Sequence, residues 1–145
     1  MKKKAFTLIK PMFLAVMMVI LANTSSDSYS SPEKFDGKEI PKLARRVTDF
    51  TNTLSKEQVD KLESKLEQYE KQTSNQIAIV IIPSLNGKVL EEYSMAIAQG
   101  NKLGQKGKDN GLLILLSIKE RKLRIEVGYG LEGVLPDGLC GRIRD

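Results

Sequence analysis

The sequence predicts an α/β fold: a three-layer α/β/α sandwich whose mixed sheet combines a parallel crossover with an antiparallel hairpin. Two apolar runs, 76–82 and 112–118, suit strands that are covered on both faces. A helix-length segment separates them, so they should be parallel and joined by a right-handed crossover. An alternating segment at 123–127 follows a four-residue turn and should return antiparallel to the second run.

The first helix is expected from about 56 to 72. Ser55 and Gln58 have the spacing of a capping box, in which each side chain bonds the backbone N–H of the other residue. Apolar residues then recur at helical spacing, at Val59, Leu62, Leu66 and Tyr69.

The second helix is expected at 89–103, between the two buried runs. A polar loop, 104–110, leads from it into the second run. The charged turn 119–122 precedes the return strand, whose alternating pattern indicates that one of its faces meets solvent. A last helix is expected to open at Pro136 and Asp137.

The start of the chain predicts export. Basic residues precede a 12-residue apolar stretch at 11–22, and small residues follow, which is the pattern of a secretory signal peptide over 1–22. An uncleaved membrane anchor is the alternative. Residues 23–43 are expected to be a flexible tether, and 44–145 the folded domain. The expected location is the periplasm or outer cell envelope.

Composition excludes several chemistries. The chain has no histidine and one cysteine, so Ser-His-Asp and Cys-His catalysis and intrachain disulfides are excluded. The net charge is +5, but residues 1–22 hold four lysines and no acid. The remaining 19 basic and 18 acidic residues leave about +1, so nucleic acid is not an expected partner.

Carboxylates should meet at one edge of the predicted sheet. The amino ends of the two parallel strands share an edge with the carboxyl end of the return strand. That edge receives Gln76, and the carboxylates Asp109, Glu132 and Asp137 together with the amide Asn110. Oxygen ligands of this kind suit Ca²⁺ or Mg²⁺. The alternative is that Asp109-Asn-Gly is a plain turn and Asp137 a plain helix cap.

A nucleotide cofactor is not expected. Residues 128–133 match G-x-G-x-x-G, but the preceding strand is a hairpin return strand and no helix opens within the glycines. The glycines more simply allow positive φ in a tight loop.

Four segments, 47–55, 76–80, 107–116 and 121–137, resemble the TPM domain family. The last contains Glu-Val-Gly-Tyr-Gly-Leu-Glu-Gly-Val-Leu-Pro-Asp, a long and specific block. The family includes bacterial envelope proteins, a plant thylakoid-lumen protein and a photosystem II repair factor. The resemblance covers about 44–145. The family domain usually continues through further helix, so the chain is expected to be either a fragment or a minimal version.

The resemblance implies an α/β/α sandwich outside the cytoplasm. It links the chain to Ca²⁺ or Mg²⁺ binding, to maintenance of membrane protein complexes and to acid phosphatase activity. By position, the family's acidic loop residues fall on Asp109, Glu132 and Asp137, and Asp49 matches a further family position. Three functions stay open: a cation-binding accessory factor for envelope complexes, a metal-assisted phosphomonoesterase, and a purely structural acidic loop.

Overall fold

A computed structural model describes residues 37 and 39–135 of the 145-residue chain. The predicted signal peptide, most of the predicted tether, the helix expected at Pro136 and the candidate ligand Asp137 lie outside the described residues. No helix in the part that the structure describes combines the length and hydrophobicity needed to span a bilayer.

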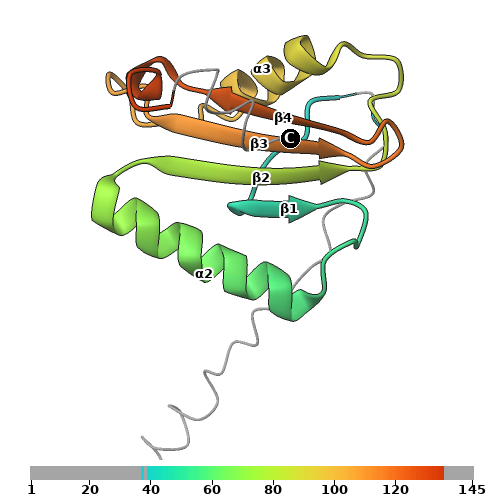
Figure 1. Cartoon of the computed structure of the whole chain (residues 1–145), viewed down its shortest axis with the longest axis horizontal. Coiled ribbons are helices and arrows are strands. Elements are labelled where there is room, and N and C mark those ends of the chain that lie inside the picture. The colour runs from blue at the N-terminus through green and yellow to red at the C-terminus, as the bar shows by residue number, and fades with distance from the viewer. Residues whose placement is uncertain (1–36, 38, 136–145) are drawn as a thin grey trace, which may run out of the picture. The chain divides into compact units, whose positions relative to one another are not determined.

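The described helices and strands follow the predicted order, with a short strand added at the start and a 3-10 turn added at the end (Figure 1). In chain order they are β1 (Val47–Asp49), α2 (Lys56–Thr73), β2 (Gln76–Ile82), α3 (Leu90–Gly100), β3 (Gly111–Ser117), β4 (Lys122–Val127) and the 3-10 turn η1 (Tyr129–Leu131).

The four strands form one mixed sheet in the order β1-β2-β3-β4. β2 and β3 are parallel, with Gln76 opposite Gly111, and β4 returns antiparallel with Val127 opposite Leu112. The predicted crossover and hairpin are therefore confirmed. β1 was not predicted; it is parallel to β2, with Val47 opposite Ile79. Three residues are too few to show an alternating pattern.

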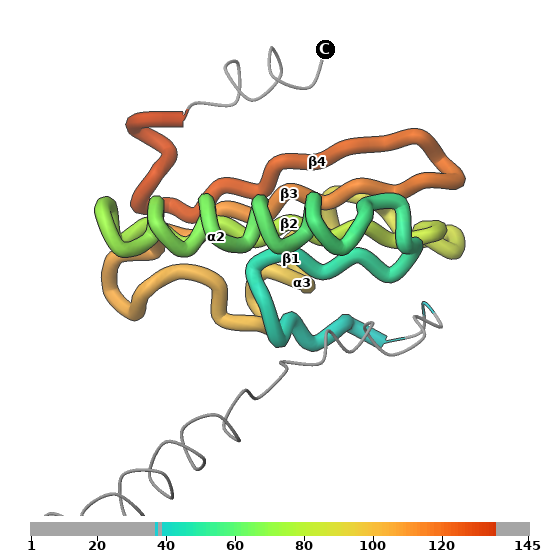
Figure 2. Tube along the Cα trace, turned by 90° about the horizontal axis from the view of Figure 1, so that it is seen from below, coloured from blue at the N-terminus to red at the C-terminus, as the bar shows by residue number. Residues whose placement is uncertain are grey.

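The helices lie on opposite faces of the sheet, which confirms the three-layer arrangement (Figures 1 and 2). α3 covers the main core, in which its Tyr93 and Ile97 pack with Val80 of β2 and Leu113 and Leu115 of β3. α2 lies over β1 and β2. Because β1, β2 and β3 are parallel and in sequential order, helices on opposite faces give the two crossovers opposite hands. Right-handed crossovers are the rule, so one of these two is an exception.

Local chemistry sets the helix ends. The predicted capping box begins α2: Ser55 Oγ accepts from the Gln58 N–H at 3.3 Å, and Gln58 Oε1 accepts from the Ser55 N–H at 2.8 Å. The second helix was expected to reach 103 but ends at Gly100. Asn101 Nδ2 turns back to bond the Ile97 carbonyl, and Lys102 adopts a positive φ of 50°.

The loops at one edge of the sheet complete the fold. The amino ends of β2 and β3 and the carboxyl end of β4 meet there, as the sequence predicted. Two segments supply this edge, 101–110 before β3 and 128–135 after β4, and we call them together the rim. The β3–β4 hairpin turn lies at the opposite end of the same strands.

Candidate functional site

Backbone hydrogen bonds join the two halves of the rim. The Gly130 N–H donates to the Asp109 carbonyl at 3.0 Å, and the Gly128 N–H donates to the Gly111 carbonyl at 2.7 Å. A Cβ at Gly130 would collide with the carbonyl oxygen of Lys108, so only glycine permits this approach. The glycines of this loop therefore serve close packing. The positive φ expected of them is wrong, because Gly128 has a φ of −66° and neither Gly130 nor Gly133 has a positive φ.

Asn110 is buried at the centre of the rim, and its amide is fully engaged. Its Oδ1 accepts from the Gln105 N–H at 2.8 Å, and its Nδ2 donates to the Ser74 carbonyl at 2.7 Å and to Asn75 Oδ1 at 3.3 Å. One side chain thus ties the loop before β3 to the end of α2. This amide organises the rim from within.

Gln76 has a similar structural role. Its Oε1 accepts from the Gly104 N–H at 2.8 Å, and its Nε2 donates to Glu70 at 3.1 Å. Like Asn110, it lies where the sequence placed it, with its oxygen already bonded to the protein.

The two described carboxylates of the predicted cation site point to solvent. Asp109 is exposed and has a φ of 48°, the left-handed conformation that Asp tolerates in turns. Glu132 is exposed directly after η1. Within residues 37 and 39–135, no group of three or more acidic, histidine or cysteine residues gathers around a point that could hold a metal. The described part of the predicted site therefore consists of two exposed carboxylates, and carboxylate oxygen is a ligand type that Ca²⁺ and Mg²⁺ prefer.

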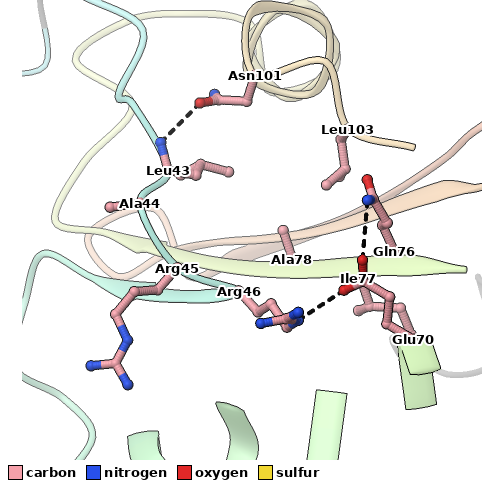
Figure 3. A pocket seen from close by; sticks show the side chains of 10 residues that line it. All are labelled: Leu43, Ala44, Arg45, Arg46, Glu70, Gln76, Ile77, Ala78, Asn101 and Leu103. Atoms are coloured by element: carbon pink, nitrogen blue, oxygen red, sulfur yellow. Dashed lines mark hydrogen bonds and ion pairs between the residues drawn. The ribbon is translucent and has the colours of Figure 1, made fainter. Parts of the chain in front are cut away.

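A second feature is an open pocket of about 240 Å³ beside the amino end of β2 (Figure 3). Its lining residues are Leu43, Ala44, Arg45, Arg46, Glu70, Gln76, Ile77, Ala78, Asn101 and Leu103. The pocket exists because β1 starts only opposite Ile79, so the first residues of β2 pair with β3 but have no strand on the β1 side. Asn101 holds the entering chain by accepting from the Leu43 N–H at 2.8 Å.

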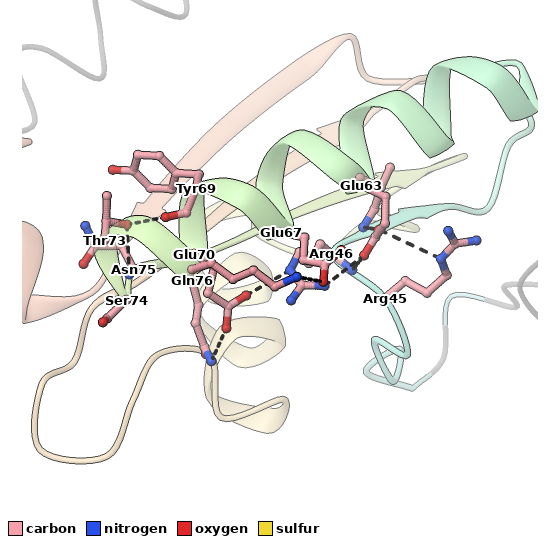
Figure 4. Close-up of polar contacts among 12 residues, drawn as sticks. Arg45, Arg46, Glu63, Glu67, Tyr69, Glu70, Thr73, Ser74, Asn75 and Gln76 are labelled. Atoms are coloured by element: carbon pink, nitrogen blue, oxygen red, sulfur yellow. Dashed lines mark hydrogen bonds and ion pairs between the residues drawn. The ribbon is translucent and has the colours of Figure 1, made fainter.

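The polar wall of this pocket is a network of ion pairs (Figure 4). Arg46 contacts Glu70 at 2.9 Å and Glu63 at 3.3 Å. Burial by itself would lower the pKa of the Arg46 guanidinium, but its hydrogen bonds to Glu70 and Glu63 outweigh burial and raise that pKa. Since these charges neutralise one another, the network fastens α2 to the chain entering β1.

Two further carboxylates lie at the opposite end of the sheet, and both are engaged. Asp49 is buried at the carboxyl end of β1, where it accepts from the Thr51 and Leu54 N–H groups at 2.8 Å each. The family-matched Asp49 is therefore not part of the rim. Glu120 accepts from Ser117 Oγ and Ser84 Oγ, and these hydrogen bonds lower the pKa of its carboxyl to about 2.

The fold and the rim define a small α/β/α domain in which two exposed loops, each with one carboxylate, lie at one edge of a mixed sheet. A family model described as the TPM domain matches residues 47–145, and the chain belongs to this family. The match starts at β1 and includes both halves of the rim.

Two solved structures are similar. The N-terminal domain of a protein from P. gingivalis is 37% identical, with a TM-score of 0.64, over 68% of this chain and 63% of that one. The N-terminal domain of the cg2496 protein from Corynebacterium glutamicum is 23% identical, with a TM-score of 0.52, over 61% and 56%, and shows the fold alone. The present chain thus spans less than two thirds of either domain structure. No curated protein gives a match.

Sequence reasoning missed the ion-pair network and the pocket. Arg46 and Glu70 are 24 residues apart in the sequence, and Arg46 meets Glu63 and Glu70 only when α2 packs beside β1. The spacing of Glu63 and Glu70, seven residues apart on one helix, shows that they share a face but not what faces them.

Proposed function

We propose that the chain is an exported TPM-domain module that binds a divalent cation, Ca²⁺ or Mg²⁺, at the rim and acts as an accessory factor for membrane protein complexes of the cell envelope. Asp109 and Glu132 would provide carboxylate ligands, and Asp137 follows in the same segment of the sequence. The single observation that carries the proposal is the hydrogen bond from the Gly130 N–H to the Asp109 carbonyl, which joins the loop that carries Asp109 to the loop that carries Glu132.

The state of the two carboxylates supports cation binding. Asp109 and Glu132 are exposed, and neither carboxylate has an ion-pair partner among the described residues. By contrast, Asp49, Glu63 and Glu120 already accept hydrogen bonds from the protein. Asp109 and Glu132 therefore keep the capacity to bind a ligand from solution.

In this proposal Asn110 is a positioning residue for the carboxylate of Asp109. Its amide hydrogen bonds fix the loop on which Asp109 stands, and the neighbouring carboxylate is held ready without a contact of its own. A preformed loop reduces the entropy that cation binding would otherwise cost.

The export proposal is supported by the basic and apolar pattern of residues 1–22. An extracytoplasmic compartment also suits a weak calcium site, since extracellular modules bind Ca²⁺ in the range of about 10⁻⁴–10⁻³ M.

Titration calorimetry of the full chain tests cation binding. We expect heat of binding for CaCl₂ or MgCl₂ and its loss in the double variant Asp109→Asn/Glu132→Gln. The control variant Glu91→Gln/Glu92→Gln removes two exposed acids from α3 and should bind like the wild type. Equal binding by all three proteins would place any cation elsewhere.

A metal-assisted phosphomonoesterase is the second candidate, favoured by the short name of the matching family model, TPM phosphatase. A divalent cation would supply Lewis-acid polarisation of the phosphoryl group, and Asp109 would orient the attacking water. The test compares hydrolysis of a generic phosphomonoester by the wild type and by Asp109→Ala. Loss of turnover would support this function, and equal rates would point to a contaminating enzyme.

A further inference from the structure

The rim presents two apolar side chains to solvent. Tyr129 is 79% exposed and Val134 is 74% exposed, whereas the other large exposed apolar residues among those described lie between 41% and 52%. Both belong to the eight-residue segment 128–135. Two such side chains on one short loop form a tip that the fold does not cover.

The backbone of the segment holds this tip outward. Leu131 is 8% exposed and points inward, and its N–H donates to the Gly128 carbonyl at 2.8 Å. The Val134 N–H donates to the Leu131 carbonyl at 3.0 Å. With Leu131 as the inward anchor, the turn places Tyr129 before it and Val134 after it on the solvent side.

Three exposed lysines lie on the other half of the rim. Lys102, Lys106 and Lys108 are exposed, and none of them forms an ion pair within the part of the chain described. Lys108 is adjacent to the tip, since its carbonyl oxygen occupies the place where a Gly130 side chain would lie. Three lysines face two carboxylates, Asp109 and Glu132, so this edge carries a small positive excess.

We propose that the rim docks onto an anionic bilayer surface, with Tyr129 and Val134 at the level of the lipid headgroups. Tyrosine is favoured at membrane interfaces because its ring is apolar and its hydroxyl group stays hydrated. Lysines beside an inserted apolar tip are attracted by the negative potential of anionic lipids. A protein surface that combines exposed apolar side chains with lysines that form no ion pair is suited to binding an anionic bilayer.

A competing surface lies at the opposite end of the sheet. The hairpin turn carries Lys119, Arg121 and Lys122, and its Glu120 is engaged by two serines. It has more net positive charge than the rim, but its one exposed large apolar residue, Ile118, is 45% exposed. β3 separates the two ends by seven residues, roughly 23 Å, so a domain that docks end-on through the rim holds the hairpin away from the membrane. The more exposed apolar side chains favour the rim as the membrane contact, whereas net positive charge by itself would favour the hairpin turn.

The test locates the contact residue by residue. The full chain is mixed with bicelles of phosphatidylcholine and phosphatidylglycerol that contain a nitroxide-labelled lipid, and amide signals are recorded by NMR. EDTA is present throughout, so the result does not depend on the cation proposal. We expect broadening of amides 106–108 and 128–135. Broadening of amide signals centred on 118–122, or no broadening in the domain, would overturn the proposal. The exposed tip would then be a candidate contact for a protein partner.

Variants give the second readout. Tyr129→Ser/Val134→Ser should weaken vesicle binding by roughly tenfold, because the two apolar groups no longer leave water. Lys106→Glu/Lys108→Glu should also weaken it, and more strongly at low salt. The matched controls are Val89→Ser/Met95→Ser, at the N-cap and within α3, which removes two other exposed apolar groups, and Lys119→Glu/Lys122→Glu at the hairpin. Equal losses in a control would contradict docking through the rim.

Discussion

The backbone N–H of Gly130 lies 3.0 Å from the carbonyl oxygen of Asp109, and this hydrogen bond links the loop before β3 to the loop after β4. It requires a glycine, because any side chain at position 130 would enter the space of the Lys108 carbonyl. The joined loops carry both the proposed cation ligands and the exposed tip.

Gly130→Ala should therefore destabilise the domain by about 1–3 kcal/mol, since the added methyl meets backbone that cannot move aside without breaking the link. Gly133→Ala is the matched control in the same segment, where a Cβ would meet nothing within 4 Å. It should change stability by less than about 0.5 kcal/mol. Urea unfolding of both variants measures the difference, and equal stabilities would refute the packing role of Gly130.

Asn110→Ala should cost about 2–4 kcal/mol, because it leaves the Gln105 N–H and the Ser74 carbonyl without their partner at a largely buried position. Asp109→Asn, the neighbouring exposed change, should stay within about 0.5 kcal/mol, since Asn also tolerates positive φ. Denaturant midpoints report both. A much smaller loss of stability in Asn110→Ala would mean that water replaces the Asn110 amide and that this amide does not organise the rim.

Glu63→Ala should destabilise the chain by about 2 kcal/mol. The Glu63 carboxylate accepts from the backbone N–H groups of Arg46 at 3.1 Å and Val47 at 2.9 Å, so its loss exposes the start of β1 to fraying. Lys71→Ala removes an exposed pair with Glu67 and should cost less than about 0.5 kcal/mol. Hydrogen exchange at 47–49 should accelerate only in Glu63→Ala. Equal exchange in both variants would refute the anchoring role.

The stability of the chain should depend on Glu120 in acid. Because hydrogen bonds from Ser117 and Ser84 lower the folded-state pKa of this carboxyl from 4.5 to about 2, the unfolded chain binds its proton first as the pH falls. The contribution is fully present above about pH 4.5 and is lost as the pH falls through about 2. The stability gap between the wild type and Glu120→Gln should shrink across that window, measured by urea unfolding. A constant gap would show that the carboxylate is not stabilised.

Much of the fold could be predicted because local chemistry and the tertiary structure agree. The Ser55–Gln58 capping box forms as its spacing indicates, and the apolar run Gln76–Ile82 is β2 to the residue. β1 could not be predicted, because three residues are too few to show an alternating apolar pattern. Its pairing with β2 also depends on the long connection through α2.

The candidate site was predictable in position more than in detail. Strand direction correctly brought Asp109 and the segment after β4 to one edge. The engagement of the Asn110 amide was not predictable, because its partner Ser74 is 36 residues away and is placed by the end of α2. The outward tip also escaped sequence reasoning, since the pattern around Leu131 does not show which apolar side chains turn inward.

The most direct test of the central claim follows the amide chemical shifts of the full chain during a Ca²⁺ titration, with Mg²⁺ in a parallel series. The account predicts shifts confined to the rim, at 109–111 and 128–135, that saturate at about millimolar cation, and their loss in Asp109→Asn/Glu132→Gln. Amides that stay unmoved at millimolar Ca²⁺ and Mg²⁺, or shifts centred on the far end around Asp49 and Glu120, would contradict it.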